Sequence, residues 1–185
     1  DMISIIIPTY NERKNISKIL NNLKKINTTY EVIFVDDKSE DGTFDEIIKY
    51  KSKKIVGYLR KSLKKDLSKS VLFGIKRAKY NNILVMDCDL QHNPQYISKM
   101  WKKYRLNNFD IIIANRFCKQ KIIGNLGFLR SFISLSSIKL INFIFGKKTQ
   151  DPLSGFFLCK KNKILKFEKF FFLKGYKILF DIIYN

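Results

Sequence analysis

The stretch that indicates the fold of this chain is Asn82-Ile83-Leu84-Val85-Met86-Asp87-Cys88-Asp89-Leu90-Gln91-His92-Asn93-Pro94. Its four apolar residues, 83–86, have the length and side-chain types of a buried strand. Asn93 and Pro94 stand in the order of a helix N-cap and a first helical position. Residues 87–92 are therefore predicted to form a loop at the carboxyl end of a strand, where open α/β sheets bind ligands.

Two carboxylates, Asp87 and Asp89, stand one residue apart in this predicted loop. Close carboxylates repel each other unless a cation lies between them, and Mg²⁺ and Mn²⁺ prefer a few carboxylates together with ligand phosphates. The loop is therefore a candidate for a divalent cation that holds a diphosphate. An ordinary solvated loop is the alternative for Asp-x-Asp taken alone. His92, the only histidine, is expected to be structural or to lie behind the metal ligands rather than to act as a base.

Other apolar runs continue the pattern on both sides of this stretch. Strands are predicted at 3–7, 31–35, 54–59, 83–86 and 110–114, with helices at about 16–26, 43–51, 67–79 and 94–105. Repeated strand–helix alternation predicts a mostly parallel sheet with helices on both faces. Asp36 and Asp37 follow one strand and Arg116 follows another, so these groups are expected at the same sheet edge as Asp87 and Asp89.

Motif content and charge narrow the function classes. The first strand is not followed by Gly-x-Gly-x-x-Gly, and no Walker lysine loop occurs, which counts against dinucleotide dehydrogenases and P-loop enzymes. The net charge is +20, and only six of the 36 basic residues are arginines. This charge favours anionic partners such as phosphates, acidic lipid or nucleic acid without choosing among them. The three cysteines lie far apart, which fits a reducing compartment better than a disulfide framework.

The sequence changes character after residue 117. Leu126–Phe145 is apolar nearly all round, with only Arg130 and Lys139 charged. Such a segment is either a core helix or a helix lying in a membrane interface, and both interpretations stay open. Lys166–Lys177 places several phenylalanines among lysines and is a second candidate for membrane contact. No run reaches about 18 apolar residues, so no membrane span is predicted. The chain also stops in mid-pattern at 181–185, and we expect it to be a fragment of something longer.

Five segments in order resemble the inverting, GT-A-type glycosyltransferases of family 2, and most closely the dolichol-phosphate or polyprenyl-phosphate sugar synthases. They are Pro8-Thr9-Tyr10-Asn11-Glu12, the residues 35–43 with their Asp-Asp-x-Ser-x-Asp-Gly-Thr pattern, 87–94, Asn115-Arg116, and Asp151-Pro152-Leu153-Ser154-Gly155-Phe156-Phe157. Residues 175–178 also look like a later family signature. The match spans essentially the whole chain.

The resemblance implies an α/β fold of the GT-A type. This is a Rossmann-like, mostly parallel central sheet flanked by helices, with amphipathic membrane-interface helices in the C-terminal third. Residues 1–117 would be the half that binds the nucleotide sugar. Residues 118–185 would be the acceptor- and membrane-facing part of the same domain, cut short at its C-terminus, without the family's later basic segment.

The resemblance also implies site residues. The base and ribose pocket would be lined by Pro8, Tyr10, Glu12, Val35 and Asp37. The donor diphosphate would meet Asp87, Cys88 and Asp89, and Mg²⁺ or Mn²⁺ would be held by Asp87, Asp89 and Gln91. Catalysis would rest on Asp89 and on Arg116, which contacts phosphate, while Arg130 would meet the phosphate of the acceptor lipid.

The implied activity is transfer of a hexose from a nucleotide sugar, GDP-mannose being favoured, to a polyprenyl or dolichyl phosphate at the cytoplasmic face of a membrane. A lipid phosphate is already anionic, so it can attack the anomeric carbon without a strong general base. The departing nucleoside diphosphate is the difficult part, because its growing charge needs a metal and positioned cations. No nucleic acid is expected as a partner, and the oligomeric state is not predicted.

Several alternatives remain from the sequence. UDP-glucose or another UDP-sugar shares these motifs, and a glycan hydroxyl acceptor would need a base, for which Asp151 is a candidate. The family usually has Gly-Leu-Ser where this chain has Asp66-Leu67-Ser68, and Ala where it has Ser70. Asp66 adds negative charge beside the expected donor site, which leaves a catalytically inactive scaffold open. The charge alone is also compatible with a basic module that binds nucleic acid or anionic lipid without catalysis.

Overall fold

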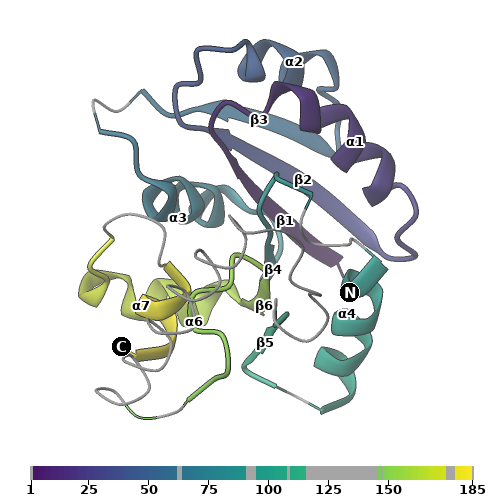
Figure 1. The fold of residues 1–185 in the computed structure, drawn as a ribbon. Coiled ribbons are helices and arrows are strands. Elements are labelled where there is room, and N and C mark those ends of the chain that lie inside the picture. The colour runs from purple at the N-terminus through teal and green to yellow at the C-terminus, as the bar shows by residue number, and fades with distance from the viewer. Residues whose placement is uncertain are drawn as a thin grey trace, which may run out of the picture.

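The computed structural model describes residues 2–61, 64–90, 95–107, 109–115, 146, 148–173 and 178–184. Their strands form one sheet of six, in the order β3-β2-β1-β4-β6-β5 (Figure 1). The strands are β1 (Met2–Thr9), β2 (Thr29–Asp36), β3 (Ile55–Leu59), β4 (Asn82–Val85), β5 (Ile111–Ile113) and β6 (Phe157–Lys160). β1, β2, β3 and β4 pair in parallel, whereas β6 runs antiparallel to both β4 and β5. The mostly parallel α/β sheet expected from the alternation is therefore confirmed.

Helices cover both faces of the sheet. They are α1 (Arg13–Leu23), α2 (Thr43–Lys49), α3 (Leu67–Arg77), α4 (Gln95–Asn107), α6 (Lys161–Phe167), the short 3₁₀ helix η2 (Glu168–Phe170) and α7 (Ile178–Tyr184). One core cluster joins the sheet to α1, α2 and α4, and the other joins it to α3, α6 and α7. The neighbouring β1 residues Ile5 and Ile6 belong to different clusters, because successive side chains of a strand point to opposite faces. Burial on both faces explains why these strands are continuous apolar runs.

The strand register brings the predicted site residues to one edge. Thr9 at the end of β1 pairs with Asp36 at the end of β2, and Ile6 pairs with Val85 at the end of β4. Asp37 and Asp87 therefore emerge from the carboxyl ends of β2 and β4, the two strands that flank β1, and lie at one sheet edge as the sequence predicted. Arg116, which follows β5, lies outside the described residues, as do Leu126–Phe145.

The C-terminal third contributes one strand, β6, to the sheet. β6 lies inside the sheet, between β4 and β5, and its residue Phe157 pairs with Val85. Across the described residues, no helix is both long and apolar enough to cross a bilayer.

Candidate active site

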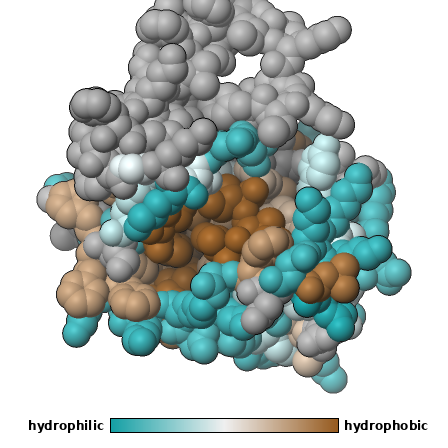
Figure 2. All heavy atoms as spheres, turned by 90° about the horizontal axis from the view of Figure 1, so that it is seen from below, coloured by the Kyte–Doolittle hydropathy of each residue, from teal (hydrophilic) through white to brown (hydrophobic). Residues whose placement is uncertain are grey.

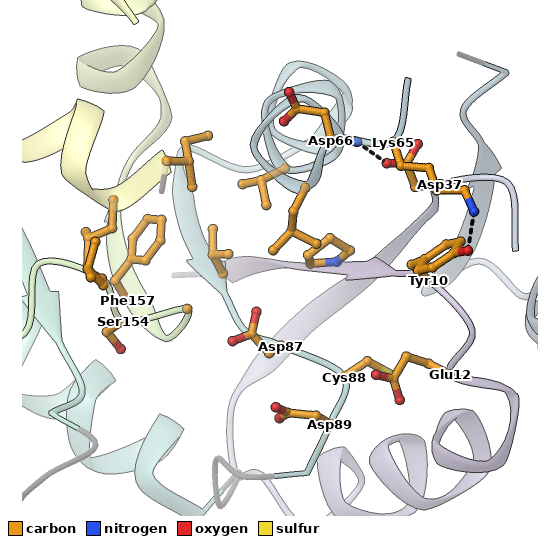
Figure 3. Close-up of a pocket in the computed structure, with 18 residues that line it drawn as sticks. Tyr10, Glu12, Asp37, Lys65, Asp66, Asp87, Cys88, Asp89, Ser154 and Phe157 are labelled. Atoms are coloured by element: carbon orange, nitrogen blue, oxygen red, sulfur yellow. Dashed lines mark hydrogen bonds between the residues drawn. The ribbon is translucent and has the colours of Figure 1, made fainter. Parts of the chain in front are cut away.

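A cavity of about 430 Å³ opens at the carboxyl ends of β1, β2 and β4 (Figure 3). It is also bordered by the start of α3, by the segment that precedes β6, and by α7. Its lining residues are Pro8, Tyr10, Glu12, Asp37, Lys65, Asp66, Leu67, Val71, Val85, Asp87, Cys88, Asp89, Leu153, Ser154, Gly155, Phe157, Ile178 and Leu179. Residues from both halves of the chain therefore build one cavity.

The loop that carries Tyr10 and Glu12 is tied to the loop after β2. The backbone N–H of Asn11 donates to Ser39 Oγ at 2.8 Å, and that of Glu12 donates to Thr43 Oγ1 at 2.8 Å. Asn11 adopts φ 55, a left-handed conformation that asparagine tolerates better than most residues. The serine and threonine of the 35–43 motif thus fix the loop from which Tyr10 and Glu12 reach the cavity. The sequence pointed to this motif but not to this role.

Asp37 is held at the other side of the cavity by a buried arginine. Arg60, which directly follows β3 and is 8% exposed, places its NH2 nitrogen 2.5 Å from Asp37 Oδ1. This contact lacks hydrogen-bond alignment at Oδ1, so it is chiefly an ion pair. The backbone N–H of Asp66 donates to Asp37 Oδ2 at 2.5 Å. Arg60 was not predicted as a site residue, although an arginine directly after a strand of a lysine-rich chain was an available signal.

Asp66, the departure from the family pattern, serves as the N-cap of α3. Its Oδ1 accepts the backbone N–H of Lys69 at 3.2 Å, and the residue is 9% exposed. A carboxylate in this position satisfies an unpaired amide and interacts favourably with the helix dipole. Figure 3 shows the carboxylate pointing toward α3 and away from Asp87 and Asp89. Asp66 therefore makes a capping bond through its side chain, which glycine lacks.

Three carboxylates gather at the opposite end of the cavity. Burial raises the pKa of Glu12 above its ordinary value, and the negative charges of Asp89 and Asp87 add to this, although a hydrogen bond from Asn15 acts against it. Asp87 is half-buried and Asp89 is exposed. Negative charges that lie this close together repel, and a cation between them relieves the repulsion. This end of the cavity is therefore electrostatically suited to a metal ion.

The ligating atoms at this end of the cavity fit a metal ion that is also bound by a substrate. Carboxylate oxygens suit Mg²⁺ and Mn²⁺, which commonly take one or two carboxylates and complete their shell with water and phosphate. Within the described ranges, no group of three His, Cys, Asp or Glu side chains forms a metal site by itself. Gln91, the third predicted ligand, lies outside those ranges. Cys88 is buried, and burial raises the pKa of its thiol, so it stays a neutral wall residue.

Lys65 contributes a cation at the mouth of the cavity. Its ammonium bonds to the hydroxyl of Tyr10 and lies 4.0 Å from the centroid of the Tyr10 ring. The bond to Tyr10 raises the pKa of Lys65. This role could not be predicted from the sequence, because a contact with a residue 55 positions away leaves no local signal.

Asp151, the candidate base for a hydroxyl acceptor, is fully buried and does not line the cavity. The next polar residue, Ser154, does line it, and its hydroxyl donates to the backbone oxygen of Ala114 at 2.8 Å. In this arrangement the carboxylate of Asp151 does not face an acceptor within the cavity.

Most of the predicted site residues meet in this one cavity. Those that line it are Pro8, Tyr10, Glu12, Asp37, Asp87, Cys88 and Asp89. Val35 does not line it: it is fully buried in the core cluster that includes Val71 and Ile75 of α3. The predicted residues Gln91, Arg116 and Arg130 lie outside the described part of the chain, as does His92.

Comparison with known proteins extends these findings. The chain is 38% identical to a dolichol-phosphate mannosyltransferase of Pyrococcus furiosus over 98% of its own length and 52% of that protein. It is 33% identical to a putative glycosyltransferase of Bacillus subtilis over 88% of its length and 49% of that protein. The chain thus spans about half the length of these relatives.

The fold also matches a solved structure. Glucosyl-3-phosphoglycerate synthase from Mycobacterium tuberculosis, in complex with Mn²⁺, UDP-glucose and phosphoglyceric acid, superposes with a TM-score of 0.73 at 15% identity. That match covers 98% of this chain and 63% of the synthase, and it confirms the GT-A type of fold. The glycosyl transferase family 2 model matches residues 4–171, and the chain therefore belongs to glycosyl transferase family 2.

Proposed function

We propose that the cavity binds a nucleotide sugar together with Mg²⁺ or Mn²⁺, and that the protein transfers the hexose to a polyprenyl or dolichyl phosphate. The observation that carries this proposal is the polarity of the cavity. Asp37, with its buried Arg60, stands at one end, and Glu12, Asp87 and Asp89 stand at the other. Such a cavity accommodates a molecule with hydrogen-bond donors at one end and a diphosphate at the other.

Asp37 and Tyr10 would hold the base. Each carboxylate oxygen has two lone pairs, so it can accept a second hydrogen bond besides its contact with Arg60 or with the amide of Asp66. Guanine offers a ring N–H and an adjacent amino group that one carboxylate can accept together, whereas uracil offers a single ring N–H. This supports GDP-mannose, as does the name of the Pyrococcus relative. A UDP-sugar is the alternative to test, since the Mycobacterium synthase was crystallised with UDP-glucose.

Asp87 and Asp89 would hold the metal against the donor diphosphate. When bound, the metal would neutralise the charge that develops on the departing nucleoside diphosphate. The acceptor phosphate is itself the nucleophile, so no proton has to be removed from it. The burial of Asp151 away from the cavity supports this kind of acceptor over a glycan hydroxyl, which needs a base.

A membrane surface would supply the lipid acceptor. Phe170 and Phe172 are 58% and 70% exposed, and Lys169 lies 5.0 Å from the ring centroid of Phe170. Exposed phenylalanines beside lysines are suited to an anionic bilayer surface. Phe171, which the sequence grouped with them, is instead buried in the core cluster of α3 and α7. The bilayer-facing set therefore excludes Phe171.

An apolar hollow adjoins this aromatic segment. It has a volume of about 350 Å³ and includes Phe167 and Phe171 in its wall, with Lys148 and Lys163 among its polar residues. Figure 2 shows hydrophobic atoms gathered in a hollow within a hydrophilic border. This surface adds apolar area to the proposed membrane-facing side.

Calorimetric titration with GDP-mannose, UDP-glucose and duplex DNA, each with and without Mn²⁺, tests the proposal. We expect one sugar nucleotide to bind tightly only with Mn²⁺, followed by hexose transfer to a polyprenyl phosphate in detergent. Salt-sensitive binding of DNA without Mn²⁺-dependent nucleotide binding would instead identify a basic nucleic-acid-binding module. Transfer to a glycan hydroxyl but not to the lipid phosphate would contradict the proposed acceptor.

A further inference from the structure

Gly155 lies directly against the carboxyl group of Asp87. A Cβ atom added at Gly155 would stand 1.9 Å from Asp87 Oδ2, 2.4 Å from Cγ and 2.5 Å from Oδ1. All three positions are far inside van der Waals contact, so any larger residue requires Asp87 to move. Figure 3 shows Asp87 beside the segment that carries Ser154 and Phe157.

Backbone conformation does not explain why this residue is glycine. Positive φ occurs in the described glycines Gly42 and Gly146, and Gly155 is not among them. An alanine could therefore adopt the backbone of Gly155. The close approach of Asp87 is the remaining physical reason for the missing side chain.

The backbone is held in place on both sides of the contact between Gly155 and Asp87. The residue before Gly155, Ser154, bonds to the backbone oxygen of Ala114, and the backbone N–H of Ala114 donates to Phe156 at 2.9 Å. Phe157 pairs with Val85 across β6 and β4, and Asp87 follows Val85 by two residues. The strand pairing thus fixes the separation of the two backbones, and only the Asp87 side chain has freedom to turn.

We propose that Gly155 is a positioning residue that sets the direction of the Asp87 carboxylate. Its bare backbone leaves the space that the carboxyl group occupies and closes one side of it. Asp87 is thereby held in the cavity wall near Asp89 and Glu12, where its charge acts on Glu12. The inference rests on the proposed function, in which Asp87 holds a metal against the donor diphosphate.

The arrangement also joins the two parts of the chain. The segment 151–157 belongs to the part expected to face the acceptor, whereas Asp87 belongs to the half expected to bind the donor. The geometry of a metal ligand in one part is therefore set by the backbone of the other.

The test is a double-mutant cycle of Gly155→Ala and Asp87→Ala, with two measurements on each variant. The first is the dissociation constant of GDP and of UDP with and without Mn²⁺, and the second is the melting temperature in EDTA. We expect Gly155→Ala to weaken Mn²⁺-dependent binding by about 10- to 100-fold, as loss of an orienting partner of a metal ligand does. Binding without Mn²⁺ should remain unchanged.

The cycle isolates the contact because Asp87→Ala removes the atoms that the new methyl group would meet. The double variant should bind no more weakly than Asp87→Ala alone and should melt above Gly155→Ala. Gly57→Ala is the matched control, since its Cβ would stand 2.6 Å from Ile47 Cγ2, away from the cavity. It should lower the melting temperature and leave the Mn²⁺ dependence at the wild-type value.

Different results would contradict the positioning role of Gly155 and the proposed function. A folded Gly155→Ala variant with wild-type Mn²⁺ dependence, or penalties that simply add in the double variant, would refute the positioning role. If Gly155→Ala does not fold and adding Asp87→Ala does not restore folding, the steric role of Asp87 is wrong. A wild-type protein that binds neither nucleotide with Mn²⁺ refutes the proposed function, while the melting temperatures still report on the contact.

Discussion

Arg60 and Asp37 form an ion pair in which both side chains are buried, with 10% and 4% of their surfaces exposed. Arg60 also donates from Nε to Ser70 Oγ at 3.0 Å, so the guanidinium links the ends of β2 and β3 to α3. Arg60→Ala should lower the free energy of unfolding by about 3–5 kcal/mol, because it leaves a buried carboxylate without its partner. Urea denaturation measures this change, and Arg77→Ala on the surface is the control. A loss of less than about 1 kcal/mol would mean that the pair contributes no more to stability than an exposed ion pair does.

Asp89 is exposed in the loop after β4 and is not a member of either core cluster. Asp89→Ala should abolish the Mn²⁺-dependent part of nucleotide binding while the stability stays within about 0.5 kcal/mol of the wild type. Calorimetric titration of a nucleoside diphosphate with Mn²⁺ measures the first effect, and thermal unfolding measures the second. Unchanged Mn²⁺-dependent binding in this variant would remove Asp89 from the metal site.

The capping role of Asp66 predicts a graded response to substitution. Asp66→Ala should cost about 1 kcal/mol of stability, and Asp66→Gly only a few tenths, because glycine is a tolerable N-cap. Since the carboxylate points toward α3, nucleotide affinity should remain unchanged in the glycine variant. A marked gain in affinity in Asp66→Gly would show instead that the negative charge of Asp66 opposes the donor.

The raised pKa of Glu12 predicts a pH dependence in the metal-free protein. A carboxyl group whose pKa is raised on folding binds more protons in the folded state than in the unfolded state. Stability should therefore fall as the pH rises from the ordinary value of 4.5 through the raised pKa. Urea denaturation in EDTA between about pH 4 and 7 measures this slope. The Glu12→Gln variant should lack the part of this slope that Glu12 contributes, so its stability should fall less with rising pH than that of the wild type. Identical slopes in the two proteins would contradict the assignment.

The exposed phenylalanines predict binding to anionic vesicles. A Phe170→Ser, Phe172→Ser variant should float less with phosphatidylserine liposomes than the wild type, and salt should weaken binding of both proteins. Because these side chains are exposed, the variant should keep its melting temperature, whereas Phe171→Ser should lower it. A wild-type protein that stays wholly unbound at low salt would contradict the membrane contact.

The sequence was a good guide to the parallel part of the sheet and a poor one to contacts between distant residues. The buried strands were recognisable because both faces are apolar, and Asp37 and Asp87 were predicted at one edge because parallel strands end together. The direction of β6 was not predictable, since it depends on the path of a long preceding segment. Arg60 and Gly155 were missed because their partners are fixed only by the register of neighbouring strands. Asp66 was seen as a departure, but its capping role required the course of the chain into α3.

The position of β6 in the sheet has a consequence for the order in which the chain can fold during synthesis. β5 pairs with β6, which leaves the ribosome much later, and β4 also waits for the same strand to complete its outer side. The nascent chain can therefore assemble β1, β2, β3 and β4 early, but it cannot close the far part of the sheet until β6 has emerged. The segment 151–157, which lies beside Asp87 in the cavity wall, takes its place only then, and Ile178 and Leu179 of α7 follow it.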